Sequence, residues 1–229
     1  MLPGLANRLG QLNTFQHRNS EKLFGKIVSH EDIKKILKNA VTSKKPVHIL
    51  LVGPPGSAKT MFLLDTRRYY KETLFVVGSN TTKSGLLNRL FEARPRLVLV
   101  DELEKMNRND QNSLLHLMET GIISETKVNK TRQMELISWV FGSANSCEKI
   151  SEPLLSRFIV LKIPEYTFEE FKEIAIFRLK EEDIDEKSAL TIAQKVWYEL
   201  GSRDVRDIIK ISRLVHNLQE IDFIVEAMK

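Results

Sequence analysis

Short, fully apolar runs alternate with amphipathic segments along the first two thirds of the chain. Each apolar run has the length of a strand, and the segments between them repeat their apolar residues with the period of a helix. The predicted strands are residues 48–52, 73–78, 96–102, 137–145 and 157–164, and the predicted helices between them are residues 58–70, 84–93 and 109–121. Short apolar strands that alternate with helices are typical of a parallel sheet buried on both faces. The pattern therefore predicts an α/β fold.

After Pro164 the strand pattern stops, and helical periodicity continues through residues 168–182, 187–201 and 204–228. We therefore expect two domains, an α/β domain of residues 1–163 and an all-helical domain of residues 164–229, with residues 1–22 as a basic N-terminal arm. A further amphipathic helix is predicted before the first strand, at residues 29–41, where Ser29 is expected to be the N-cap.

Composition narrows the class of protein. Hydrophobic residues make up 42% and charged residues 28% of the 229 positions, which is close to globular averages and excludes disordered and collagen-like chains. The single cysteine, Cys147, forms no internal disulfide. Because no run of about 18 apolar residues and no apolar signal region occurs, we expect a soluble cytoplasmic protein with no membrane partner.

The net charge of +5 is concentrated at the front of the chain. Residues 1–45 hold nine Lys or Arg against three acids, a net charge of +6, whereas residues 151–229 have a net charge of −4. A basic arm of this kind is typical of a polyanion contact. A helix face with solvated lysines explains the charge equally well, so both interpretations stay open.

A glycine-containing loop joins the first predicted strand of the sheet to the helix that follows it. Its sequence, Gly-Pro-Pro-Gly-Ser-Ala-Lys-Thr over residues 53–60, has the strand–loop–helix context of a phosphate-binding loop, or P-loop. Backbone N–H groups of such a loop and the positive end of the helix converge on phosphate oxygens. Lys59 would neutralise β- and γ-phosphate charge, and the Thr60 hydroxyl would ligate Mg²⁺. Ala58 stands where the common pattern has glycine, and we expect it to have a negative φ.

Two acids end the apolar run of residues 97–100. Asp101 would belong to the Mg²⁺ shell, and Glu102 would orient and polarise the attacking water as a general base. Without other motifs, two acids at the end of a strand indicate only the start of a solvated loop. Together with the P-loop they predict an Mg²⁺-dependent ATPase.

These motifs resemble those of the AAA+ ATPases, and the resemblance extends over nearly the whole chain from about Leu23. The run Val-Phe-Gly-Ser-Ala-Asn at 140–145 is similar to the family's sensor 1, so Asn145 would contact the γ-phosphate or the lytic water. Leu-Leu-Ser-Arg-Phe at 154–158 resembles the arginine-finger segment, which implies that Arg157 reaches the nucleotide of a neighbouring subunit. The resemblance implies a three-layer αβα P-loop NTPase core with a parallel sheet, followed by a small helical lid. It also implies ATP and Mg²⁺ as cofactors and a homo-oligomer in the form of a hexameric ring or spiral.

Further nucleotide contacts are implied at both ends of the chain. Residues 201–206 are similar to the lid's sensor 2, where either Arg203 or Arg206 would touch nucleotide, with Arg203 preferred. Residues 24–33 resemble the hinge before the family's first helix, where Ile27 and Val28 would flank adenine. The candidate nucleotide-binding residues are Ile27, Val28, Gly53, Pro54, Pro55, Gly56, Ser57, Ala58, Lys59, Thr60, Met61, Arg203 and Arg206. The candidate catalytic residues are Glu102, Asn145 and Arg157, and the candidate metal ligands are Thr60 and Asp101.

Residues 122–136 alternate β-forming residues around a polar tip, which predicts a hairpin. The segment resembles the hairpin before sensor 1 in the AAA+ clade of RuvB-type and minichromosome-maintenance helicases and of MoxR-type and ClpX-type proteins. In a ring such a hairpin projects toward the pore. There Lys127, Lys130 and Arg132 could follow a phosphate backbone by charge alone, although Glu125 and Glu135 offset that charge locally.

Two functions remain open at this stage. The hairpin and the basic front favour a DNA-translocating or Holliday-junction-type helicase motor, and the absence of an aromatic residue between positions 122 and 136 favours nucleic acid over a threaded protein. We expect the chain to be the motor alone, without the winged-helix domain that follows the lid of RuvB-type proteins. This expectation favours the alternative, a MoxR- or ClpX-type protein remodeller or chaperone, and protein partners that select the substrate. A non-catalytic assembly subunit is disfavoured because both Lys59 and Glu102 are present.

Overall fold

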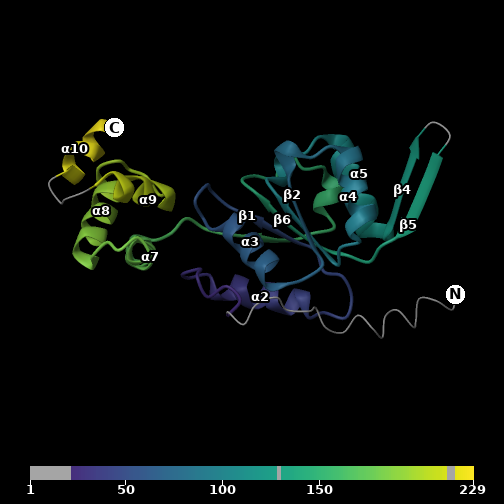
Figure 1. Ribbon diagram of the computed structural model, residues 1–229, viewed down its shortest axis with the longest axis horizontal. Coiled ribbons are helices and arrows are strands. Elements are labelled where there is room, and N and C mark those ends of the chain that lie inside the picture. Colours follow the sequence, from purple (N-terminus) through teal and green to yellow (C-terminus); the bar gives the residue numbers. More distant parts are fainter. Residues whose placement is uncertain (1–21, 128–129, 216–219) are drawn as a thin grey trace. The chain divides into compact units, whose positions relative to one another are not determined.

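The computed structural model describes residues 22–127, 130–215 and 220–229. Its contacts divide the chain into two compact units, one of residues 1–53 and 59–162 and one of residues 54–58 and 163–229. The first unit holds the strands, and the second is built mainly from helices (Figure 1). By their contacts, residues 54–58 of the P-loop belong to the second unit. Most of the basic arm, residues 1–21, lies outside the described residues.

A five-stranded parallel sheet forms the centre of the first unit, with the strand order β2-β3-β6-β1-β7 (Figure 1). The five strands, all predicted from their apolar runs, are β1 (Ile49–Val52), β2 (Thr73–Val77), β3 (Leu97–Asp101), β6 (Trp139–Ala144) and β7 (Ile159–Lys162). Every residue of β3 and β6 is buried, as expected for the inner strands of a sheet that is covered on both faces. Because all five strands run in parallel, their carboxyl ends meet at one edge.

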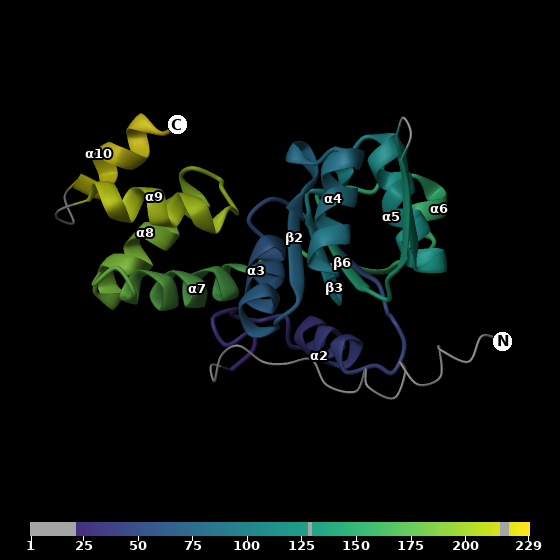
Figure 2. The ribbon, with the colours of Figure 1, turned by 45° about the vertical axis from the view of Figure 1, so that its right-hand side comes forward.

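Helices cover both faces of this sheet (Figure 2). On one face, the Trp139 indole donates a hydrogen bond of 2.9 Å to the Ala40 carbonyl, which ties β6 to α2 (Glu31–Val41). On the other face, the next residue, Val140, belongs to an apolar cluster with Leu86 and Leu114. The helices of the sheet are α2, α3 (Lys59–Tyr69), α4 (Lys83–Ala93) and α5 (Arg108–Thr120), with the short elements η1 (Gly78–Asn80), η2 (Leu103–Lys105) and α6 (Glu152–Leu155). The predicted three-layer αβα core is confirmed.

The predicted hairpin is also confirmed, as β4 (Ile122–Lys127) and β5 (Lys130–Glu135). The two strands are antiparallel and form a separate two-stranded sheet, in which Lys127 pairs with Lys130 beside the turn. Between these two residues, positions 128–129 lie outside the described part of the chain.

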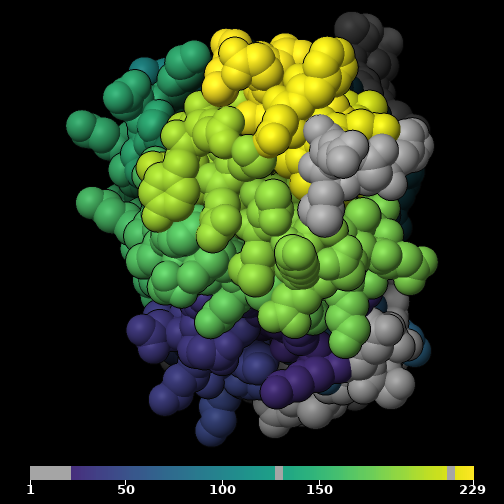
Figure 3. All heavy atoms as spheres, turned by 90° about the vertical axis from the view of Figure 1, so that its left-hand side faces the viewer, coloured from purple at the N-terminus to yellow at the C-terminus, as the bar shows by residue number. Residues whose placement is uncertain are grey.

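The second unit contains α7 (Phe168–Lys180), α8 (Glu186–Tyr198), α9 (Val205–Leu214) and α10 (Glu220–Ala227); its surface is coloured light green to yellow in Figure 3. A capping box of Thr167 and Glu170 begins α7. Fully buried Phe171, Ile192 and Ile208 come from three of the helices, which explains the helical periodicity of the sequence. Among the described residues, no helix is long and apolar enough to span a membrane.

The expected cap of α2 is wrong. The N-cap position is His30, and its side chain makes no capping hydrogen bond. Both Ser29 and His30 have left-handed backbone conformations, with φ of 63° and 60°, whereas a serine cap requires an extended backbone.

Candidate active site

The P-loop connects the carboxyl end of β1 to the first turn of α3. The Gly53 N–H donates a 3.2 Å hydrogen bond to the Ala144 carbonyl, which holds the start of the loop against β6. Lys59, the first residue of α3, is buried at 8% exposure, and its Nζ donates a 2.8 Å hydrogen bond to the Gly53 carbonyl. The loop is therefore closed by its own lysine. The N-terminus of α3 lies beside it, and the positive end of the helix dipole there favours an anion.

Ala58 differs from the sequence expectation. Its φ is +63°, so the expected negative φ is wrong, and Gly56 in the same loop has a φ of +80°. The left-handed conformation costs a non-glycine residue about 1–2 kcal/mol. The chain adopts this conformation where the loop turns into α3, so the backbone of Ala58 is strained.

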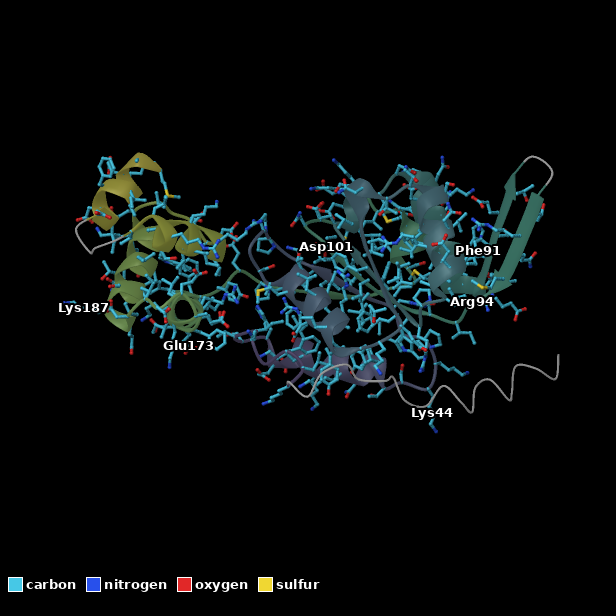
Figure 4. All side chains as sticks on the ribbon, viewed as in Figure 1. Lys44, Phe91, Arg94, Asp101, Glu173 and Lys187 are labelled. Carbon is cyan, nitrogen blue, oxygen red and sulfur yellow. The ribbon has the colours of Figure 1, made fainter. Side chains whose placement is uncertain are left out.

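The two candidate metal ligands lie next to each other. Asp101, labelled in Figure 4, ends β3, which is separated from β1 by β6. Thr60 Oγ1 lies 3.0 Å from both Oδ1 and Oδ2 of Asp101. A hydroxyl and a carboxylate supply the oxygen ligands that Mg²⁺ prefers, and Mg²⁺ commonly takes one or two carboxylates together with substrate phosphates. The pair thus fits a magnesium ion that is completed by a nucleotide.

Asp101 and Glu102 are consecutive but have different partners. Glu102 has a left-handed φ of +55°, which turns the chain sharply after β3. Its Oε1 lies 2.7 Å from Nζ of Lys105, and its Oε2 lies 3.4 Å from the hydroxyl of Ser79. The Asp101 carboxylate instead accepts hydrogen bonds from the hydroxyls of Thr60 and Ser143. Backbone strain of this kind is concentrated at functional sites, and here it separates Asp101, the candidate metal ligand, from the second acid, Glu102.

Two residues that the sequence interpretation missed join the ends of β3 and β6. The buried Ser143 hydroxyl donates to Oδ1 of Asp101 and accepts a 3.2 Å hydrogen bond from the Glu102 N–H. Glu104 Oε1 accepts from both the backbone N–H and the side-chain Nδ2 of Asn145, at 3.1 and 2.8 Å. The available signal was the spacing of Ser143 and Asn145, because residues two apart in an extended segment face the same side.

Gly78 is a third residue that was missed. A Cβ added there would lie only 2.2 Å from the Glu102 carbonyl oxygen. The end of β2 therefore approaches the acid motif at a distance that only glycine permits, and this glycine allows the turn at Glu102.

The candidate arginine finger lies at the surface of the first unit. Arg157 follows α6, and its side chain is 44% exposed. Its guanidinium pairs with Glu119 of α5 and donates a 3.0 Å hydrogen bond to the Ser156 hydroxyl. The arginine is therefore accessible, but it is held by an acid of its own chain.

The two sensor 2 candidates have different surroundings in the second unit. The Arg203 guanidinium stacks 3.6 Å from the centre of the Trp197 ring and donates 2.9 Å to the Trp197 carbonyl. Arg206 is 65% exposed and is bound by Asp204. Within this unit, residues 54, 55 and 57 line a cavity of about 300 Å³ with Tyr166, Arg203 and Asp204. Arg206 is thus the more exposed of the two, and Arg203 lines the cavity.

The three remaining candidate nucleotide contacts, Ile27, Val28 and Met61, are buried or half-buried. Ile27 is buried at 4% exposure in the core of the first unit. Val28 and Met61 are half-buried. No nucleotide contact of these three residues follows from their position.

The hairpin uses Arg132 to dock on α4. Its Nε donates a 2.9 Å hydrogen bond to Oε2 of Glu125, its Nη2 donates to Asn88, and its guanidinium lies 4.2 Å from the centre of the Phe91 ring. Phe91 is labelled on α4 in Figure 4. Arg132 was expected to follow a phosphate backbone, but its guanidinium is engaged within the chain. The side chains of Lys127 and Lys130 lie outside the described residues.

Burial also shifts the pKa of a histidine beside the sheet. His48 Nδ1 accepts a 3.1 Å hydrogen bond from the Val140 N–H, and burial lowers the pKa of His48 to about 4. The neutral imidazole is thus part of the connection between β1 and β6.

Known proteins resemble this chain in both sequence and structure. The DNA replication licensing factor Mcm2 of Drosophila melanogaster is 27% identical over 188 residues, and the probable DNA helicase MCM9 of Oryza sativa subsp. indica is 26% identical over 181 residues. These alignments cover 64% and 67% of this chain but only 21% and 27% of the two relatives.

The RuvB Holliday junction branch migration motor of Thermotoga maritima has the same fold, with a TM-score of 0.62 at 21% identity over 81% of this chain and 61% of that one. Residues 49–165, which contain the P-loop, both acids, Asn145 and Arg157, match the ATPase family associated with various cellular activities (AAA). The resemblance drawn from the motifs is confirmed, and the chain belongs to this AAA family.

Proposed function

We propose that this protein is an Mg²⁺-dependent ATPase that couples hydrolysis to movement on DNA. The observation that carries the ATPase assignment is the contact of Thr60 with Asp101, beside Lys59 and Glu102. It combines a phosphate-binding loop with two oxygen ligands and a second acid, which is the set of groups that phosphoryl transfer to water requires.

Each residue of the site has a separate task in this mechanism. The loop amides and Lys59 bind the β- and γ-phosphates, and Thr60 and Asp101 hold Mg²⁺, which offsets phosphate charge when bound. Glu102 orients the attacking water and accepts its proton, for which its carboxylate leaves Lys105. Asn145 contacts the water or the γ-phosphate. Arg157 of a neighbouring copy stabilises the charge that develops on the transferred phosphoryl group.

The DNA assignment rests on the relatives and on the hairpin. Two relatives are named as a replication licensing factor and a DNA helicase, and the structural neighbour as a branch-migration motor. We propose a homo-oligomeric ring or spiral in which residues 1–163 carry the nucleotide, residues 164–229 act as its lid, and the hairpins face a central pore. Lys127 and Lys130 at the hairpin turn would then contact phosphates without reading bases.

One observation favours the alternative, a protein remodeller or chaperone of the MoxR or ClpX type. Arg132 is occupied by Glu125, Asn88 and Phe91, which reduces the free positive charge of the hairpin. Partner proteins would then select the substrate.

The experiment that tests the proposal is the steady-state ATPase rate with and without Mg²⁺ and with single-stranded, duplex and four-way DNA at low salt. We expect Mg²⁺-dependent turnover that DNA stimulates, no nucleotide binding by Lys59→Ala, and ATP binding without turnover by Glu102→Gln. Glu92→Gln, on the exposed side of α4, is the control and should match the wild type. Full activity of Glu102→Gln would contradict the site assignment. ATP turnover without any DNA binding would transfer the assignment to the protein remodeller.

A further inference from the structure

Glu104 lies two residues after Glu102, in the short helix η2, and only 8% of it is exposed. Its Oε1 accepts two hydrogen bonds, both from Asn145: 3.1 Å from the backbone N–H and 2.8 Å from Nδ2. The two residues are 41 positions apart in sequence, and they follow neighbouring strands, β3 and β6. Glu104 is thus a buried acid whose described hydrogen bonds all go to one residue.

These contacts determine which end of the Asn145 amide faces Glu104. An ionised carboxylate only accepts hydrogen bonds, so the amide must present its NH₂ group to Glu104. Its carbonyl oxygen, Oδ1, is then directed away from Glu104. Asn145 is itself exposed, and without this partner its amide would be free to rotate. The carboxylate therefore selects one orientation of an otherwise mobile side chain.

The second oxygen of Glu104 argues against a purely structural role. Oε2 is buried and has no hydrogen-bond partner among the described residues. A buried unpaired carboxylate oxygen is costly to a fold, and an apolar or neutral residue of similar size would avoid that cost. An acid at this position therefore needs a reason other than stability.

A parallel contact supports the same arrangement. Ser143, two residues before Asn145, donates to Asp101 and accepts from the Glu102 N–H. The ends of β3 and β6 are thus joined by two side-chain connections, one on the metal-facing acid and one on Asn145. A displacement of one strand end would move both groups.

We propose that Glu104 is a positioning residue for ATP hydrolysis, which fixes the Asn145 amide so that Oδ1 faces the attacking water and accepts a hydrogen bond from it. The inference rests on the proposed ATPase function. It names a residue outside the P-loop and the Asp101–Glu102 pair, and it assigns Asn145 an acceptor role toward water. In this arrangement Glu104 acts through Asn145 and does not itself touch the nucleotide.

The test is a double-mutant cycle on the full chain that combines Glu104→Ala with Asn145→Ala, with kcat, KM and the dissociation constant of ATP measured for each variant. We expect Glu104→Ala to lower kcat about 10- to 100-fold, as misplacement of a catalytic group does, while ATP affinity changes less than about threefold. The double variant should be no slower than Asn145→Ala, because the two residues act as a unit. Glu104→Gln keeps a carbonyl acceptor but loses the charge of the carboxylate, so its kcat should lie between those of the wild type and Glu104→Ala.

Glu104→Asp covers the case in which alanine at this buried position prevents folding. It keeps the charge but is one methylene shorter, so it should also lower kcat, and Glu92→Ala on exposed α4 is the control for loss of an acid. If the wild type turns over ATP but Glu104→Ala or Glu104→Asp retains kcat within twofold, or the cycle is additive, the inference is overturned and the ATPase assignment stands. A wild type that neither binds nor hydrolyses ATP overturns both.

Discussion

Ala58 holds a left-handed backbone conformation at the point where the P-loop becomes α3. Glycine adopts this conformation without the clash that a Cβ causes, although it also increases the entropy of the unfolded chain. We therefore predict that Ala58→Gly raises the free energy of unfolding by about 0.5–1 kcal/mol, measured by urea denaturation. Ala93→Gly in the last turn of α4 is the matched control and should lower it, since a helical alanine has no such strain. If both variants lose the same free energy of unfolding, Ala58 is not strained in the wild type.

His48 predicts a pH dependence of stability. Burial lowers the pKa of His48 to about 4, from an ordinary value of 6.5, so the unfolded chain takes up the proton first as the pH falls. Stability is complete above about pH 6.5 and decreases by up to about 3 kcal/mol toward pH 4. We predict that His48→Asn flattens this part of the stability profile, whereas His116→Asn, on the exposed side of α5, leaves it unchanged. A profile that is equally steep without His48 would assign the effect to other groups.

The proposed function gives the charges of the hairpin two different tasks. Arg132 contacts Asn88 and Phe91 of α4 and pairs with Glu125 of β4, while Lys127 and Lys130 form the last residue pair of the two strands. Arg132→Lys keeps the charge but loses the planar fork and most of the ring contact. We predict a loss of about 1–2 kcal/mol in stability with an unchanged salt dependence of DNA binding.

The complementary variant removes charge at the turn. Lys127→Gln with Lys130→Gln should keep stability and reduce the slope of log affinity against log salt by up to about 2. The measurement is DNA binding by fluorescence anisotropy over a range of salt concentrations. A reduced slope in Arg132→Lys and none in the lysine variant would reverse the two tasks.

The predictable and unpredictable parts of the site differ in how far their contacts reach along the chain. Lys59 and Thr60 could be predicted because the P-loop is one contiguous segment between a strand and a helix. The contact of Ser143 with Asp101 spans 42 residues and depends on β6 lying next to β3. Hydrophobic periodicity predicts strands but not their order in the sheet, so it could not show that these two strand ends meet. For the same reason, the contact of Glu104 with Asn145 could not be predicted, because it also joins the ends of β3 and β6.

The whole molecule divides its charge between a basic front and an acidic helical region, with net charges of +6 for residues 1–45 and −4 for residues 151–229. Copies of such a chain in a ring can place opposite charges near each other, which steers association and weakens as salt is added. A site completed by Arg157 of the next copy also requires association, so the specific ATPase rate should rise with protein concentration.

Mixing two inactive variants tests whether the site is shared between copies. Arg157→Ala retains Glu102, and Glu102→Gln retains Arg157, so a junction between the two variants can hold one complete site. In a randomly mixed ring with independent sites, we predict recovery of about a quarter of wild-type turnover. Glu102→Gln mixed with the double variant, which retains neither group, is the control and should stay inactive. If the first mixture is also inactive, Arg157 does not act across a junction, and its pairing with Glu119 is its role in the fold.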